Sequence, residues 1–231
     1  FGPKSPSDRR PDAFFIYGIH PVVAALANPT RTVKRAMATR NALARLNDAG
    51  AILPVEAEEV QPRDLDRLLG GEAVHQGIAL EVAPLDPPGL EDLASGRLVV
   101  CLDQVSDPHN VGAILRSAAA FGADAVITTA RHAPAETGVL AKAASGALDL
   151  IPLIPVGNLA RALEDLAGYG YTRVGLDEAA ADTIETAMDG AQIALVMGAE
   201  GRGLRRLTRD TCDRLARLPT EGALASLNVS N

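Results

Sequence analysis

Five short apolar runs in the C-terminal part of the chain constrain its fold more than any other feature of the sequence. They are rich in Val, Ile and Leu and comprise residues 98–105, 123–130, 151–156, 171–178 and 192–200. Strands that are buried on both faces of a parallel sheet have this nearly continuous apolar character. Helical patterns separate the runs, at residues 110–122, 135–148, 158–170 and 203–212. The alternation predicts an α/β domain with a parallel sheet and crossover helices.

A second, smaller alternation of strand-like and helix-like segments precedes this one. It occupies residues 14–83 and predicts a separate small α/β domain. Residues 84–96 form the predicted linker, because the prolines of the APLDPPG segment can neither extend a helix nor pair in a central strand. We expect a flexible leader at 1–13, rich in Pro and charge, and place the parallel-sheet domain at 97–231.

Charge is unevenly distributed along a chain whose net charge is −7. A field of that sign repels polyanions at long range. Two segments are nevertheless basic: residues 1–45 hold eight Lys or Arg against two acids, and residues 202–217 hold six Arg against two acids. Two basic islands in an acidic chain are typical of local phosphate binding. The alternative is that they are solvated helix faces.

Several classes of protein are disfavoured by the composition. Cys101 and Cys212 lie far apart in the sequence and suggest neither a disulfide framework nor a zinc site. The four His show no metal-ligand spacing, so we expect no metal. No apolar run is long enough to span a membrane and no signal peptide is visible, so we expect a cytoplasmic protein. The usual glycine fingerprints of dinucleotide and P-loop sites are missing.

Three segments carry polar residues that the fold alone does not require. In the first, Asp107 and Pro108 make a turn, Asn110 is the predicted cap of the next helix, and Arg116 lies away from its apolar face. The second, GAEGRG at 198–203, follows an apolar strand, where open α/β sheets bind ligands; a plain strand-to-helix turn is the alternative. The third, at 217–231, is a strand end followed by the polar run SLNVSN.

Together these segments resemble the three motifs of the SpoU/TrmH (SPOUT) family of RNA ribose 2′-O-methyltransferases. The first matches D-P-x-N-x-G-x-x-x-R-[ST]-A from Asp107 to Ala118, the second matches G-x-E-x-x-G from Gly198 to Gly203, and the third matches S-L-N-V-S from Ser226 to Ser230. Residues 14–83 resemble the substrate-binding domain of bacterial 23S rRNA guanosine methyltransferases, which is similar to ribosomal proteins of the L30e and L7Ae type. The resemblance therefore covers nearly the whole chain.

The resemblance implies a parallel sheet with a trefoil knot, S-adenosylmethionine as cofactor, an RNA substrate and a homodimer. The polar catalytic set that it implies is Asn110, Arg116, Glu200, Ser226 and Asn228. Cofactor contacts are implied at Gly198, Leu218 and Leu227, and the basic residues that we expect to bind RNA are Arg31, Lys34, Arg35, Arg40, Arg202 and Arg205. The family continues into a helix that completes the knot, and we expect this chain, which stops at Asn231, to lack that helix.

The implied reaction is 2′-O-methylation of a ribose, with guanosine in 23S rRNA as the expected target. Because a guanidinium is essentially never deprotonated in proteins, we expect Arg116 to stabilise the developing alkoxide. Glu200 would orient this arginine or a neighbouring loop, and Asn110 would hold the loop or the ribose. The alternatives are a tRNA methyltransferase of the same family, an RNA-binding homologue without activity, and a nucleotide-dependent dehydrogenase, which the absent fingerprint disfavours.

Overall fold

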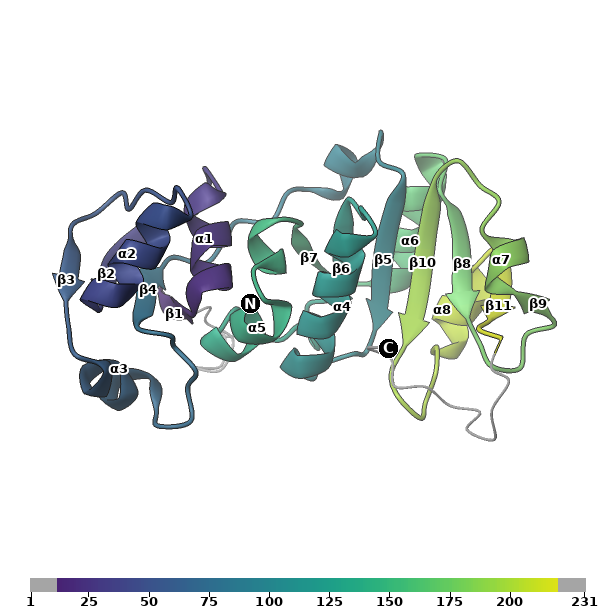
Figure 1. Ribbon diagram of the computed structural model, residues 1–231. Coiled ribbons are helices and arrows are strands. Elements are labelled where there is room, and N and C mark those ends of the chain that lie inside the picture. Colours follow the sequence, from purple (N-terminus) through teal and green to yellow (C-terminus); the bar gives the residue numbers. More distant parts are fainter. Residues whose placement is uncertain (1–11, 220–231) are drawn as a thin grey trace, which may run out of the picture. The chain divides into compact units, whose positions relative to one another are not determined.

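The computed structural model describes residues 12–219, and Figure 1 shows their helices and strands. The chain divides into two compact units. Unit 1 consists of the residues up to Asp86 together with Pro134–Leu150, and unit 2 consists of Pro87–Ala133 and the residues from Ile151 onward. The predicted knot depends on the segment from residue 220 to the end, which lies outside the described residues.

Unit 1 is built on a four-stranded sheet with the strand order β1-β4-β2-β3. Its elements are β1 (Phe14–Tyr17), α1 (Ile19–Ala27), β2 (Val33–Ala38), α2 (Arg40–Asp48), β3 (Ala57–Glu59), α3 (Pro62–Leu69), β4 (Ile78–Val82), α5 (Gly138–Ala144) and the 3-10 helix η3 (Ala147–Asp149). Strand β4 is antiparallel to both β1 and β2, whereas β3 is parallel to β2. The small N-terminal α/β domain expected from the sequence is therefore present.

Helices α5 and η3 pack against unit 1, although residues 134–150 lie within the range expected to form the parallel-sheet domain. These helices lie so close to β1 and α1 that two positions, Gly138 and Gly146, have no room for a side chain. A Cβ on Gly138 would lie 2.8 Å from the carbonyl oxygen of Phe15, and a Cβ on Gly146 would lie 2.8 Å from the Cβ of Ala24. The excursion between two strands of unit 2 thus completes the core of unit 1, a departure from the single domain expected at 97–231.

Unit 2 contains a seven-stranded sheet with the strand order β7-β6-β5-β10-β8-β11-β9. Its elements are η2 (Leu90–Leu93), β5 (Leu98–Asp103), α4 (Pro108–Ala120), β6 (Ala125–Thr129), β7 (Leu153–Val156), α6 (Leu159–Gly168), β8 (Thr172–Leu176), β9 (Asp182–Thr183), α7 (Ile184–Ala187), β10 (Ile193–Gly198), α8 (Arg206–Thr211) and β11 (Arg214–Arg217). Every pairing in this sheet is parallel, which confirms the predicted α/β class.

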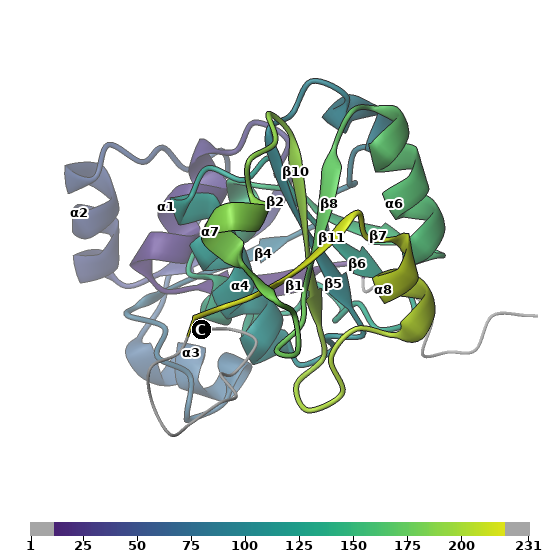
Figure 2. The ribbon, with the colours of Figure 1, turned by 90° about the vertical axis from the view of Figure 1, so that its right-hand side faces the viewer.

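Helices cover both faces of the unit 2 sheet, as Figure 2 shows: α6 and α8 lie on one face, and α4 and α7 on the other. Successive residues of each strand point to opposite faces of the sheet, so each strand contributes to a hydrophobic core on either face. Val99 and Cys101 of β5 pack in the cluster that contains the α6 leucines Leu163 and Leu166. A second cluster, on the α7 side, includes Val174 and Ala216. Burial on both faces explains the continuous apolar runs of the sequence.

Candidate functional site

The edge of the unit 2 sheet formed by the carboxyl ends of its strands contains a topological switch point between β5 and β10. These strands are adjacent and parallel, and their last residues, Asp103 and Gly198, lie opposite each other. After β5 the chain passes through α4 to β6 on one side, whereas after β10 it passes through α8 to β11 on the other side. Open α/β sheets bind ligands outside the strand ends at such a point.

The loop after β10 folds back tightly on the end of its own strand. A Cβ on Gly198 would clash with the carbonyl group of Gly203 and with the backbone nitrogen of Leu204, so only glycine fits there. Gly203 N donates a hydrogen bond to the Ala199 carbonyl oxygen at 2.9 Å. Gly201 and Gly203 have φ angles of 72° and 62°, which favour glycine. The loop therefore presents bare backbone at the switch point.

A buried carboxylate, which the sequence analysis did not select, fixes the end of β5 to the start of α8. Asp103 is fully buried and accepts hydrogen bonds from the backbone nitrogen of Arg205 at 2.9 Å and from its Nε at 2.7 Å. Arg205, which we expected to bind RNA, thus has at least one guanidinium N–H committed to a structural ion pair. An acid at the end of an otherwise apolar strand is the signal that could have identified Asp103.

Strain accompanies this ion pair in the next residue of the chain. Gln104 adopts a φ of 65°, in the left-handed region that residues other than glycine rarely occupy. Such strain persists where the surrounding structure imposes it, and it is concentrated at functional sites. The position supports the assignment of the β5–α4 loop to the site.

Helix α4 carries two of the predicted catalytic residues, but its cap differs from the prediction. Asp107 is the N-cap, and its side chain accepts a hydrogen bond from the His109 backbone nitrogen at 2.8 Å. The prediction that Asn110 caps the helix is wrong: Pro108 occupies the first helical position, so Asn110 lies inside the first turn. Asn110 is half-buried, and its amide remains available for another role.

Arg116 is exposed on α4, two turns after the strand-proximal end of the helix. Within residues 12–219 its guanidinium has no hydrogen bond or ion pair. Helical side chains tilt toward the N-terminus of their helix, so a long arginine side chain can reach back toward the turn that contains Asn110. This placement agrees with the expected orientation away from the core.

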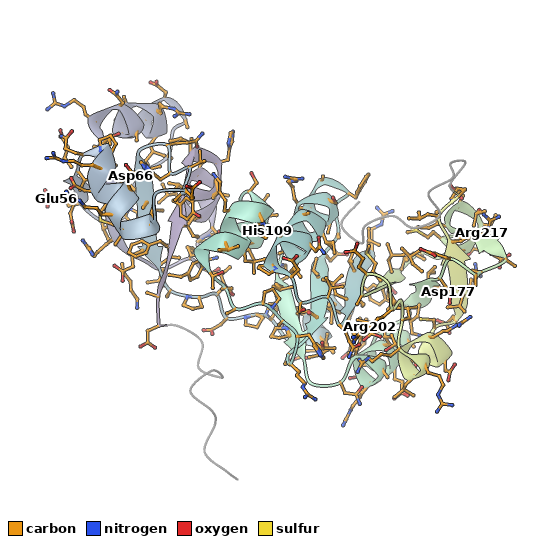
Figure 3. All side chains as sticks on the ribbon, turned by 90° about the horizontal axis from the view of Figure 1, so that it is seen from below. Glu56, Asp66, His109, Asp177, Arg202 and Arg217 are labelled. Atoms are coloured by element: carbon orange, nitrogen blue, oxygen red, sulfur yellow. The ribbon has the colours of Figure 1, made fainter. Side chains whose placement is uncertain are left out.

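Exposed residues of the site also come from the β10 loop and from the end of β11. Glu200 and Arg202 are exposed in the loop, and Figure 3 shows Arg202 in unit 2 together with His109 on α4. Leu218, directly after β11, presents a large apolar side chain that is 42% exposed. Three predicted site residues, Ser226, Leu227 and Asn228, lie outside the described residues.

Arg31 does not fit its predicted role in RNA binding. Its side chain is fully buried in unit 1, where Nε lies 2.7 Å from Asp149 Oδ1 and Nη1 donates to the Ala83 carbonyl oxygen at 2.8 Å. Nη1 also lies 3.4 Å from Glu136 Oε2. A buried guanidinium that is already paired cannot contact RNA. Because Glu136 and Asp149 belong to residues 134–150, Arg31 instead joins this segment to the rest of unit 1.

The other predicted RNA-binding residues of unit 1 are more accessible. Arg35 pairs with Glu58 at 3.0 Å, and this hydrogen bond raises the pKa of Arg35 and lowers that of Glu58. Lys34 Nζ donates to the Asp12 carbonyl oxygen at 2.7 Å. The Arg40 side chain is 87% exposed, compared with 48% for that of Arg35. Acidic neighbours therefore offset part of the N-terminal basic island.

Two further properties concern metals and membranes. Between residues 12 and 219, no three His, Cys, Asp or Glu residues gather in a way that could hold a metal ion. None of the helices within that range has the length and apolar character needed to cross a membrane.

Comparisons with known proteins match both units. Residues 97–231 match the SpoU rRNA Methylase family, and residues 15–88 match the family of RNA 2′-O ribose methyltransferase substrate binding domains. A protein of Haemophilus ducreyi named 23S rRNA (guanosine-2′-O-)-methyltransferase RlmB is 43% identical over 93% of this chain and 92% of its own length. A Pseudomonas putida protein of the same name is 40% identical over 93% of this chain and 90% of its own length.

The fold agrees with that of a solved structure, the SpoU methyltransferase AviRb from Streptomyces viridochromogenes in complex with the cofactor AdoMet. The two superpose with a TM-score of 0.78 at 21% identity, over 95% of this chain and 85% of that one. The family match covers more than half of the chain, and the two relatives named above are at least 40% identical over nearly all of it. The chain therefore belongs to the SpoU rRNA methylase family.

Proposed function

We propose that this protein transfers a methyl group from S-adenosylmethionine to the 2′-hydroxyl of a guanosine ribose in 23S rRNA. The observation that carries the proposal is the 43% identity with a protein named for this reaction, which extends over 93% of this chain and so includes both units. A relative that matched the sheet domain alone would support methyl transfer without indicating the RNA.

The residues at the switch point fit the cofactor. The loop at 198–203 offers bare backbone, with open space beside Gly201 and Gly203, and Leu218 provides an exposed apolar side chain after β11. Backbone polar groups can hydrogen-bond the adenosine and the methionine chain of the cofactor, and apolar side chains can pack against them. Gly198, Leu218 and, from the sequence motif, Leu227 would hold the cofactor, which supplies an electrophilic methyl group on a sulfonium when it is bound.

Arg116 acts on the hydroxyl that attacks. Its guanidinium keeps its proton, because arginine is essentially never neutral in proteins, and so it is not the base that removes the hydroxyl proton. It donates hydrogen bonds to the oxygen as negative charge develops there, a stabilisation that depends on a preorganised donor, while the hydroxyl proton passes to water or to an RNA phosphate oxygen. The absence of a competing carboxylate partner among the described residues leaves the guanidinium available for this role.

Other residues position the reacting groups. Asn110, half-buried in the first turn of α4, holds the ribose or the loop beside it. Glu200, at the exposed tip of the glycine loop, orients Arg116 or the loop, and the motif residues Ser226 and Asn228 complete the polar set. Lys34, Arg35, Arg40 and Arg202 contact the RNA backbone.

The test is methyl transfer from tritium-labelled S-adenosylmethionine to 23S rRNA from a strain in which the chromosomal gene is deleted. We expect label in 23S rRNA, 2′-O-methylguanosine on mass spectrometry of the digested RNA, and no label in tRNA from the same strain. Label in tRNA alone would favour the tRNA-directed alternative. A folded protein that binds 23S rRNA but transfers no label would instead be an RNA-binding homologue without activity.

Two further parts of the proposal concern assembly and location. The protein acts as a homodimer, as the family resemblance implies, and light scattering behind size-exclusion chromatography should give twice the monomer mass of 24.0 kDa. It works in the cytoplasm, where ribosomal RNA is modified. Fractionation of cells that express a tagged chain tests the location.

A further inference from the structure

Some arginines of unit 2 are held in ion pairs and others are not. Arg173 and Arg214, at the amino ends of β8 and β11, are paired with Asp213 and Asp189. Arg131, in the loop after β6, and Arg161, in the first turn of the helix after β7, are both exposed. Within the described range, neither of their guanidinium groups has an ion pair or a hydrogen bond. Unpaired exposed arginines in an acidic protein are available for an anion.

Acidic residues are absent from the segments that carry these two arginines. Residues 125–135 and 151–163 contain no Asp or Glu, although Glu164 and Asp165 follow in the next turn of α6 without forming an ion pair with Arg161. On the opposite half of the same edge, the chain after β8 contains Asp177, Glu178 and Asp182. The segments after β6 and β7 are thus basic without acids, whereas the chain after β8 carries three acids, of which only Asp177 has a cationic partner among the described residues, Arg209 at 3.2 Å.

The two arginines lie next to the candidate site in the sheet. Strand β6 is adjacent to β5, with Thr128 opposite Leu102, and β7 is adjacent to β6. Neighbouring strands are about 4.8 Å apart, so the end of β7 lies roughly 10 Å from the end of β5 along this edge. The loop with Arg131 is at the edge, whereas Arg161 is on α6, on the face of the sheet opposite α4.

We propose that Arg131 and Arg161 form an RNA backbone track that leads from the reaction centre toward β7, so that the single strand flanking the methylated ribose crosses the sheet edge on this side. The inference rests on the proposed function and adds the direction of the RNA and two residues that bind it. The direction is supported by charge beyond the β10 loop, because phosphates are attracted to Arg131 and Arg161 and repelled from Glu178 and Asp182, which have no ion pair among the described residues. Phosphate contacts of this kind position an RNA without reading its sequence.

The experiment compares Arg131→Ala, Arg161→Ala and the double variant with Arg97→Ala. Arg97 is a matched control, because it is exposed and lacks an ion pair but lies at the amino end of β5, on the opposite edge of the sheet. Affinity for a 23S rRNA transcript is measured between 50 and 200 mM salt by filter binding, together with KM for the RNA, kcat, and cofactor affinity by calorimetry.

Each alanine should weaken RNA affinity roughly five-fold at 0.1 M salt and reduce the salt slope by about 0.7, the value for one single-strand phosphate contact. The double variant should raise KM for RNA by about the product of the two effects, while kcat at saturating RNA and cofactor affinity stay within about two-fold of wild type. Arg131→Lys and Arg161→Lys should restore most of the affinity, because the charge is kept.

Two results overturn the inference. If the double variant matches Arg97→Ala in affinity and salt slope while the wild-type protein methylates 23S rRNA, the track is absent and the proposed function stands. If kcat falls and the RNA affinity is unchanged, the two residues act in the chemistry or the fold rather than as a track. Failure of the wild-type protein to methylate any RNA would instead refute the proposed function itself.

Discussion

Replacement of Arg31 by Met should destabilise unit 1 by about 3 to 5 kcal/mol, the cost of removing one partner from a buried ion pair. The side chain of Asp149 is only 2% exposed, so its carboxylate would remain buried without its cation. The Ala83 carbonyl oxygen would lose a donor at the same time. Asn28 Nδ2, at 3.1 Å from Asp149 Oδ1, still donates to the carboxylate, which places the expected loss near the lower end of the range.

Hydrogen exchange of the β4 amides measures this loss, because strands in a core exchange through unfolding of the unit that contains them. Arg35→Met is the matched control: Arg35 is also paired, but its side chain is 48% exposed, and exposed pairs contribute about 0 to 1 kcal/mol. A double variant, Arg31→Met with Asp149→Leu, should recover much of the stability, since apolar pairs can replace buried ion pairs. A loss for Arg31→Met no larger than that of Arg35→Met would refute the buried pair.

Four other predictions concern the site and Cys212. Arg116→Ala should lower kcat by at least ~10²-fold with unchanged cofactor affinity, measured by single-turnover kinetics and calorimetry, and near wild-type methylation would remove Arg116 from the mechanism. Gly198→Ala should weaken cofactor binding in calorimetry, because the new Cβ meets the Gly203 backbone; unchanged affinity would mean that the loop does not hold the cofactor. Burial raises the pKa of the Cys212 thiol to about 11, so only about a thousandth of it is thiolate at pH 8, and a thiol reagent should modify it much faster after denaturation than in the native protein. The thiol of Cys212 ionises near pH ~8.5 in the unfolded chain and near pH 11 in the folded one, so the free energy of unfolding falls as the pH rises through that window. Cys212→Ser should reduce this fall, measured as the free energy of unfolding in urea titrations at several pH values.

Much of unit 2 could be predicted from the sequence because its strands are buried on both faces. A run such as LVVCLD has few alternatives, and each long strand of the sheet from β5 to β10 was expected near its observed position. The two-residue strand β9 and the four-residue helix α7 were missed, because elements of that length show no periodicity. The identity of the capping residue was also missed: Pro108 occupies the first helical position, so the N-cap is Asp107, three residues before Asn110.

Long-range pairing is what the sequence could not reveal. The apolar pattern of residues 135–148 predicts a helix but does not indicate which core it enters, and that choice depends on contacts such as Gly146 with Ala24. Arg31 was assigned to the surface because its partners, Asp149 and Glu136, are more than a hundred residues away. The motif residues Asn110 and Arg116 lie on α4, the helix after β5, and Gly198 and Glu200 lie at and after the end of β10, the strand that pairs with β5.

The insertion of α5 and η3 into unit 1 limits how the chain can be divided. A fragment that begins at the proline-rich linker would carry α5 without the sheet that covers it, and would expose Leu140, Ala141 and Ala144, which are buried in the intact protein. The complementary fragment would retain Arg31 with no acid to neutralise it. The RNA-recruiting and methyl-transferring halves are therefore not interchangeable modules: a chimera with another recruiting domain must also exchange residues 134–150.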